Sequence, residues 1–189
     1  MGGGVRSGEA LLAEGRRDFL RRAVGLAAGL ALWPRASGAY ATRSRSLDLY
    51  AVNTGERLRV DYCIDGRYEP EGLRAVDHLL RDFRTDETYP IDARALDVLC
   101  DVRDVLGTNE TYHVVCGYRS AITNEMKLRE GRGVARHSYH LSGKAIDVFL
   151  PTRDLGDLRR AGLALGAGGV GYYPRAGFVH LDVGPVRTW

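Results

Sequence analysis

Two short apolar segments near the end of the chain each carry ionisable side chains, and this restricts the fold more than any other feature of the sequence. Residues 178–183 alternate so that, in a strand, valine and leucine fall on one face while His180 and Asp182 share the other. Residues 145–150 alternate in the same way and place Asp147 opposite the apolar face. Because an ionised carboxylate is costly to bury without a partner, the fold must supply these strands with opposite charges or a metal ion.

The ionisable residues have the composition of a catalytic zinc site. Such sites use three protein ligands and leave a fourth position to water, and His140, Asp147 and His180 form a set of this kind. Gly143 lets the chain turn tightly, so that a loop ligand and a strand ligand can converge. Each residue alone is a weak indication, because a single histidine beside a strand is usually structural and Asp147 could be solvated. The combined spacing predicts one zinc ion, which would lower the pKa of bound water towards about 7.

The remaining segments predict interleaved helices and strands. From alternation or short apolar runs, strands are expected over 46–52, 58–62, 112–116, 145–150 and 178–183. Helices are expected over 70–84, between Asp92 and Gly107, and over 121–130 and 155–165. Loops are expected over 131–139 and over the glycine-rich segment 166–171. This order predicts an α+β fold with a small mixed or antiparallel sheet flanked by helices.

The first forty residues have the layout of an export signal. Residues 16–22 carry two arginine pairs, an apolar run of about 11 residues follows over 23–33, and small residues stand at 39–41. A membrane span needs about 20 residues, so the run is too short to cross a bilayer. Arg16-Arg17 resembles a twin-arginine signal, a route that carries folded proteins. We therefore expect a signal peptide over 1–41, a catalytic domain over 42–189 and a periplasmic location; an amphipathic helix or a retained membrane anchor are the alternatives.

The net positive charge of the chain lies in this leader. It holds six of the 27 basic residues and three of the 24 acidic residues, which leaves 21 of each sign in 42–189. A protein that binds a phosphate backbone needs a basic stripe, so nucleic acid is not an expected partner.

The chain has three cysteines, at positions 63, 100 and 116. They lack the C-x-x-C spacing of a thiolate zinc site, so we do not expect them to bind the metal. An odd number fits a disulfide framework poorly, and buried free thiols are the simpler interpretation. An oxidising compartment would still permit one bridge, such as Cys100 to Cys116.

The pattern Ser138-x-His140-x-x-Gly143-x-Ala145-x-Asp147, with a later histidine in an apolar strand, resembles the D-alanyl-D-alanine metallopeptidases. These form one zinc superfamily with lysostaphin-type enzymes and the hedgehog signalling domain. Further matches, over 117–120, 123–124, 168–174 and 178–185, resemble the murein endopeptidase K-like branch. The resemblance covers nearly all of 46–189 and implies a hedgehog/DD-peptidase-like zinc fold.

The resemblance also implies roles for individual residues. His140, Asp147 and His180 would be the ligands of a single zinc ion. Arg119 would hold a substrate carboxylate or stabilise the developing oxyanion, unless it is a surface arginine at a strand end. Ser138 would orient His140 or its loop.

Two further residues are expected at the substrate. Asn124 would contact it, with a helix-capping or surface role as an equal alternative. The segment 168–174 could form a rim of the cleft, where Tyr172, together with Tyr173, would line the peptide; a simple glycine-rich connection is the alternative.

The resemblance does not supply the general base. Relatives often place a histidine or an acidic residue two or three positions before the last zinc histidine. Here those positions are Phe178 and Gly177, which cannot move protons. Asp182 is the nearest carboxylate and shares a strand face with His180, so it is expected to be the catalytic base or to orient the site. His137 is a weaker candidate. Two other histidines are not expected to take part: His78 and His113.

Together these features predict a zinc-dependent murein endopeptidase that hydrolyses amide bonds between peptidoglycan stem peptides. A D-Ala-D-Ala carboxypeptidase is the alternative within the enzymes. A zinc-containing module that binds peptidoglycan without cutting it is the alternative outside them. The sequence leaves the type of cross-link open.

Overall fold

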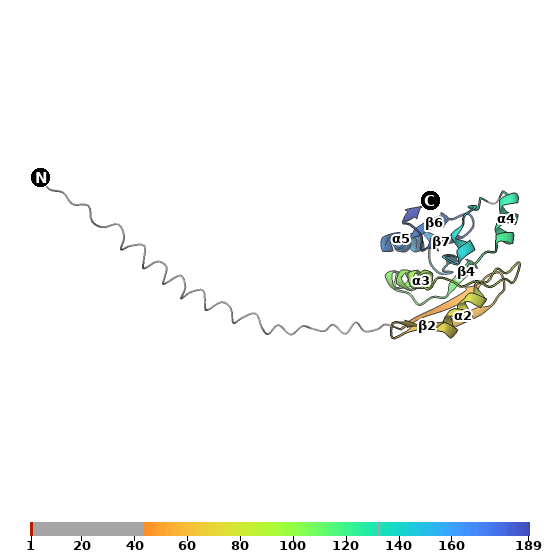
Figure 1. Cartoon of the computed structure of the whole chain (residues 1–189), viewed down its shortest axis with the longest axis horizontal. Helices are drawn as coiled ribbons and strands as arrows, with labels where there is room; N and C mark the ends of the chain where they lie inside the picture. Colours follow the sequence, from red (N-terminus) through yellow and green to blue (C-terminus); the bar gives the residue numbers. More distant parts are fainter. Residues whose placement is uncertain (2–43, 132) are drawn as a thin grey trace. The chain divides into compact units, whose positions relative to one another are not determined.

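The computed structural model describes Met1, residues 44–131 and residues 133–189 (Figure 1). Apart from Met1, the expected signal peptide over 1–41 therefore lies outside the described residues. All described residues from 44 onward belong to one compact unit. No helix within this described part is long and apolar enough to cross a membrane.

The fold is α+β, as predicted, with one sheet of eight strands in mixed orientation. The strands are β1 (Arg45–Ala51), β2 (Arg57–Ile64), β3 (Arg67–Tyr68), β4 (Tyr112–Cys116), β5 (Ala145–Phe149), β6 (Gly169–Tyr173), β7 (Phe178–Asp182) and β8 (Arg187–Thr188). The helices are α2 (Pro70–Leu79), α3 (Ala93–Leu106), α4 (Ala121–Arg129) and α5 (Leu155–Leu165), with a 3₁₀ helix, η1, at Tyr139–Ser142. The strand order across the sheet is β3-β2-β1-β4-β5-β7-β6-β8.

Helices α3 and α5 pack against each other and against the sheet. The apolar side of α3 buries Leu96, Leu99 and Val102 completely, which contributes about 1.5–3 kcal/mol for each side chain. In α5 the backbone of Gly162 approaches Leu181 so closely that a Cβ there would lie 2.8 Å from its side chain. Since Leu181 alternates with His180 and Asp182 along β7, α5 covers the sheet face opposite to these two polar residues.

Two segments differ from the sequence prediction. The helix expected over 70–84 ends at Leu79, because the carboxylate of Asp82 accepts hydrogen bonds from the Ser120 amide at 2.8 Å and its hydroxyl at 2.7 Å. This contact turns the chain away from the helix axis and fixes the start of α4. The glycine-rich connection contains strand β6, since pairing with β7 on one side and β8 on the other outweighs the low strand propensity of glycine.

The register of the central strands forms a row of residues across one face. Cys116 of β4 lies opposite Asp147 of β5, Asp147 lies opposite His180 of β7, and His180 lies opposite Gly171 of β6. Residues directly opposite one another in paired strands have Cβ atoms about 5 Å apart, so their side chains meet. This row, on the face that α5 leaves free, is the base of the candidate site.

Candidate metal centre

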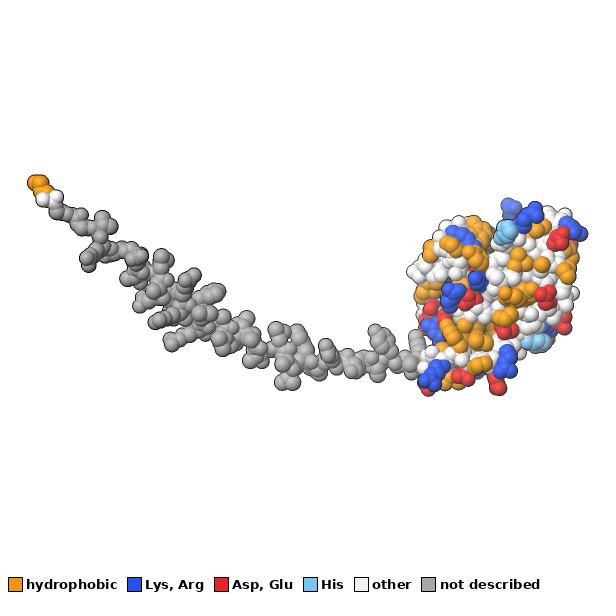
Figure 2. Space-filling model, in the orientation of Figure 1, with side chains coloured by type: hydrophobic (Ala, Val, Ile, Leu, Met, Phe, Trp, Pro, Cys, Tyr) orange, Lys and Arg blue, Asp and Glu red, His pale blue; other side chains and the backbone are white. Residues whose placement is uncertain are grey.

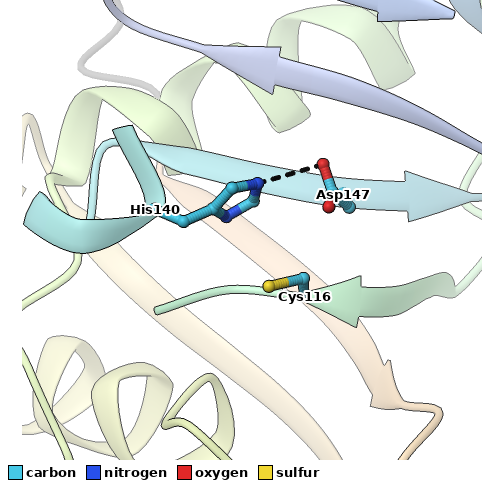
Figure 3. Close-up of side chains that lie close together, drawn as sticks. All are labelled: Cys116, His140 and Asp147. Atoms are coloured by element: carbon cyan, nitrogen blue, oxygen red, sulfur yellow. Dashed lines mark hydrogen bonds and ion pairs between the residues drawn. The ribbon is translucent and has the colours of Figure 1, made fainter. Parts of the chain in front are cut away.

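Helix η1 brings His140 to this row from outside the sheet (Figure 3). Ser138 is its N-cap and accepts a hydrogen bond from the His140 amide at 3.4 Å, so it fixes the turn rather than the imidazole. Gly143 ends the turn at φ 63°, where a Cβ would collide with the carbonyl of Pro90. A glycine is therefore required at this position for His140 to reach Asp147.

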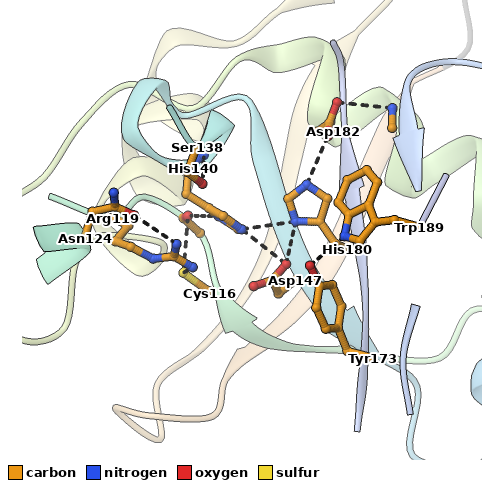
Figure 4. Close-up of polar contacts among 12 residues, drawn as sticks. Cys116, Arg119, Asn124, Ser138, His140, Asp147, Tyr173, His180, Asp182 and Trp189 are labelled. Carbon is orange, nitrogen blue, oxygen red and sulfur yellow. Dashed lines mark hydrogen bonds and ion pairs between the residues drawn. The ribbon is translucent and has the colours of Figure 1, made fainter. Parts of the chain in front are cut away.

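Three donor atoms converge at the centre of the row. His140 Nε2 lies 3.2 Å from Asp147 Oδ1 and 3.2 Å from His180 Nδ1, and His180 Nδ1 lies 2.8 Å from Asp147 Oδ1 (Figure 4). Donors that share one tetrahedral zinc at 2.0–2.2 Å stand roughly 3.3 Å apart, so the set fits one ion after shifts of a few tenths of an ångström. All three residues are buried, with at most 7% of the surface of each exposed.

A second donor set overlaps with the first and was not predicted. The Cys116 thiol, His140 and Asp147 have ligand atoms within 4.8 Å of one another (Figure 3). We favour His180 as the third donor, since its Nδ1 lies 3.2 Å from His140 Nε2 and 2.8 Å from Asp147 Oδ1. Cys116 was not expected here, because the cysteines lack C-x-x-C spacing. Its place before the 117–120 motif, in a strand that pairs with β5, was the only available indication.

The thiol of Cys116 nevertheless interacts electrostatically with the charged side chains of the site. Burial raises its pKa, but the positive charge and hydrogen bond of His140, with the Arg119 charge, outweigh burial and lower the pKa. Arg119 Nη2 lies 3.5 Å from the sulfur. The three cysteines are free thiols, so the alternative of a Cys100–Cys116 bridge is not what the structure contains.

Two hydrogen bonds set the tautomers of the imidazoles. His140 Nδ1 lies 2.7 Å from the carbonyl oxygen of Gly117, which only accepts, so this nitrogen carries the proton and Nε2 faces Asp147. His180 Nε2 lies 3.0 Å from Asp182 Oδ2, so its Nδ1 faces Asp147. Metal-binding histidines are commonly oriented in this way by a carbonyl or a carboxylate behind the ring.

The charges of the metal-free site stabilise one another. Burial lowers the pKa of His140, but the charges of Asp147 and Cys116 and their hydrogen bonds outweigh it and raise the pKa to about 10. Burial raises the pKa of Asp147, but His140 and His180 together hold it well below its usual range. Without metal, the site is therefore a buried imidazolium–carboxylate pair near neutral pH.

We expect the His140 imidazole of metal-free protein to stay protonated until the pH approaches about 10. Because this pKa lies above the value of about 6.5 for an unfolded chain, the pair stabilises the metal-free fold fully below pH 6.5 and loses that contribution as pH rises towards 10. Asp147→Asn should lower the pKa of His140, since burial then acts with less opposition. A pH titration of the imidazole nitrogens by NMR measures this. A His140 imidazole that already loses its proton below pH 7 would contradict it.

Asp182 lies behind His180, on the side of the ring away from Asp147 (Figure 4). Its side chain is fully buried and accepts from Arg187 at 2.7 and 3.1 Å, from the Gly169 amide at 3.1 Å and from the Gly184 amide at 2.8 Å. Burial raises the pKa of Asp182, but His180 and Arg187 hold it well below its usual range. A base must reach water on the open side of the metal, so this position favours the orienting role over the catalytic one.

Arg119 follows β4 and is a buried cation with only neutral or thiol partners. It is 6% exposed, and its Nη1 lies 3.3 Å from Asn124 Oδ1. Its Nε has no hydrogen-bond partner, and no carboxylate within the described ranges forms an ion pair with it. Because a buried charge without a carboxylate partner is costly, this guanidinium is suited to an anionic group of a ligand or a reaction.

Other predicted residues take different places. Asn124 is buried, and its side-chain amide donates to the Ala135 carbonyl at 3.3 Å and accepts from Arg119. Both polar atoms of the amide therefore have partners within the protein. Tyr172 pairs with Val179 in β7 and packs on the core face, with the Arg159 guanidinium 5.3 Å from its ring. Of the two tyrosines expected at the cleft, Tyr172 therefore lies on the core face, and Tyr173 shares the face of His180.

The remaining histidines lie apart from the three donors. His113 lies between the rings of Tyr50 and Phe149, with centroids 4.8 and 5.0 Å away. His137 is exposed in the loop before η1, and His78 is exposed in the last turn of α2.

On the face drawn in Figure 2, basic and acidic side chains are interspersed, in keeping with the balanced charge of 42–189.

Comparison with known proteins gives consistent matches over this part of the chain. A family model described as peptidoglycan L,D-endopeptidase MepK matches residues 39–189. A protein of Haemophilus influenzae named probable peptidoglycan L,D-endopeptidase MepK is 39% identical over 168 residues, which cover 87% of this chain and 90% of that protein. Peptidoglycan L,D-endopeptidase MepK of Escherichia coli K12 is 41% identical over 170 residues, covering 87% of this chain and 92% of that protein.

Proposed function

Because the chain belongs to the family of the peptidoglycan L,D-endopeptidase MepK, we propose that it is a zinc-dependent murein endopeptidase that hydrolyses amide bonds in peptidoglycan cross-links. The observation that carries the zinc dependence is the set of three buried donor atoms, 2.8–3.2 Å apart, from His140, Asp147 and His180. A hedgehog/DD-peptidase-like zinc fold is part of the proposal. So are a twin-arginine signal peptide over 1–41, a catalytic domain over 42–189 and a periplasmic location.

In the proposed mechanism, His140, Asp147 and His180 hold the metal. When bound, zinc supplies a water of lowered pKa and polarises the scissile carbonyl. The Gly117 carbonyl and Asp182 keep the two imidazoles in the tautomers that turn a free nitrogen towards Asp147. The Arg119 guanidinium stabilises negative charge on the substrate or on the developing oxyanion, a task for which its lack of a carboxylate partner suits it.

The names of the relatives narrow the substrate. They describe an L,D-endopeptidase, which cuts between an L-configured and a D-configured centre inside a chain. We propose the same class of bond here, such as the direct 3-3 link between two diaminopimelate residues. The partners are then peptidoglycan stem peptides and their cross-links. The carboxypeptidase and the non-catalytic module remain as alternative outcomes of the test.

The test is a digest of defined substrates by zinc-loaded protein. We expect cross-linked stem-peptide dimers to give monomers, and linear stem peptides ending in D-Ala-D-Ala to stay intact. Removing the metal with a chelator should abolish cleavage, and about one equivalent of zinc should restore it. Release of terminal D-Ala alone would favour the carboxypeptidase. Tight binding of murein by the zinc-loaded protein without any cleavage would favour the module.

A further inference from the structure

The last residue of the chain, Trp189, lies at the candidate site, although no motif of the sequence pointed to it. Strand β8 pairs in parallel with the start of β6. Beyond β8, the Trp189 amide donates to the Val170 carbonyl at 3.3 Å, and its carbonyl accepts from the Tyr172 amide at 2.9 Å. The end of the chain therefore extends the edge of the sheet, and the indole is held on the face of His180.

The indole contacts the site on several sides (Figure 4). Its ring centroid lies 5.3 Å from that of His180, at an interplanar angle of 52°. Its Nε1 donates to the Tyr173 hydroxyl at 2.6 Å, and the Arg187 guanidinium lies 4.9 Å from the ring centroid. Hydrogen bonding and cation–π contact thus fix both the tilt and the position of the ring.

The strand beneath the indole leaves room for it. A Cβ at Gly171, the residue opposite His180, would lie only 2.7–2.9 Å from three atoms of the indole. Any side chain at this position would push the ring away from the imidazole. The glycine in β6 therefore allows the indole to lie close to the strand, next to His180.

Although it is held so firmly, Trp189 is 46% exposed. A ring that served only to fill space would be expected to be covered. A rigid, half-exposed aromatic ring is well suited to contact a ligand, because it offers a large apolar surface and loses little conformational freedom on binding. Its position places this surface beside the imidazole that faces the metal.

We infer that the indole of Trp189 forms one wall of the substrate cleft, against which the peptide planes and aliphatic groups of a stem peptide pack, and that Tyr173 and Arg187 hold this wall in place. The inference rests on the proposed function and adds a substrate contact to it. Trp189 thus joins Tyr173 on this side of the sheet, while Tyr172 faces the core.

Kinetics separate a wall from a residue that only positions His180. Losing an aromatic contact should raise KM for a cross-linked dimer about tenfold in Trp189→Ala, with kcat changed no more than about twofold. Bound zinc should stay near one per chain, and Trp189→Phe should restore most of the loss. Tyr173→Phe, which removes the partner of the indole, should raise KM by a smaller factor, whereas the matched variant Tyr172→Phe should leave it unchanged. A fall in kcat and zinc content with KM unchanged would overturn the inference.

Fluorescence provides a second test that does not require a destabilised variant. The sequence contains two tryptophans, Trp33 and Trp189, so Trp33→Phe in the full chain makes Trp189 the only indole. The tetrapeptide stem is a product that cannot be cut further at the cross-link. We expect this peptide to change the fluorescence emission of Trp189, and the change should saturate as the peptide concentration rises. If the emission of Trp189 stays unchanged at peptide concentrations well above KM, the inference is wrong. The proposed function still holds in that case, provided that the same variant cleaves the cross-linked substrate. Absence of both zinc binding and cleavage would remove the proposed function first.

Discussion

His140→Ala and His180→Ala are each expected to reduce the cleavage of cross-linked murein by roughly 1000-fold or more, and to bring bound zinc close to zero. Each change removes one of three donor nitrogens or oxygens that lie 2.8–3.2 Å apart, and two protein ligands hold zinc far less tightly than three. The loss should appear in kcat as well as in kcat/KM, because the metal acts on the reacting bond itself. Metal analysis and a muropeptide digest of the same preparations measure both effects.

Two further variants serve as controls for the loss of zinc and of turnover. His78→Ala changes an exposed histidine in the last turn of α2 and should retain wild-type zinc content and turnover. Asp147→Asn keeps the shape of the carboxylate but removes its charge, so it should lose zinc to a similar degree as the histidine variants. If His140→Ala and His180→Ala release the same fragments as the wild type at the same rate, the proposed mechanism is wrong.

Much of this centre could be predicted from local sequence. Period-two alternation in β5 and β7 gave the faces of Asp147, His180 and Asp182 correctly, since each strand contains enough apolar residues to define its phase. The α+β class followed from the order of elements. These inferences depend only on residues that are neighbours along the chain.

The rest depended on contacts between distant segments. Because β6 is rich in glycine, its strand character and phase could not be recognised, and Tyr172 was expected at the cleft together with Tyr173. Arg187 and Trp189 reach the site only through the pairing of β8 with β6. Cys116 lies at the site because the register of β4 and β5 shifts between Val114 and Cys116 and places Cys116 opposite Asp147. None of these pairings leaves a periodic pattern in the sequence.

Asp182→Ala is expected to destabilise the protein by about 3 kcal/mol and to weaken zinc binding by roughly 10- to 100-fold. The carboxylate accepts from His180, Arg187 and two backbone amides, and its removal leaves buried donors without a partner. This loss of stability lies at the lower end of the range of about 3–5 kcal/mol for a broken buried ion pair. The reason is that the Arg187 side chain is 38% exposed and regains some hydration when the carboxylate is removed. Denaturant unfolding of metal-free protein and zinc titration measure the two effects separately.

Asp182→Asn distinguishes the orienting role from a catalytic base. The amide has nearly the same shape. Where its NH₂ group takes the place of Oδ2, however, it donates to His180 Nε2 and favours the His180 tautomer with its proton on Nδ1, the nitrogen that should face the metal. An orienting residue then loses zinc affinity first, and saturating zinc recovers much of kcat. A base loses kcat at full zinc occupancy, with stability and affinity nearly unchanged. As a matched control, Asp154→Ala removes the exposed N-cap of α5 and should cost about 1 kcal/mol with no change in zinc affinity. Since the side chain lies behind the imidazole and already accepts from four groups, we expect the first result.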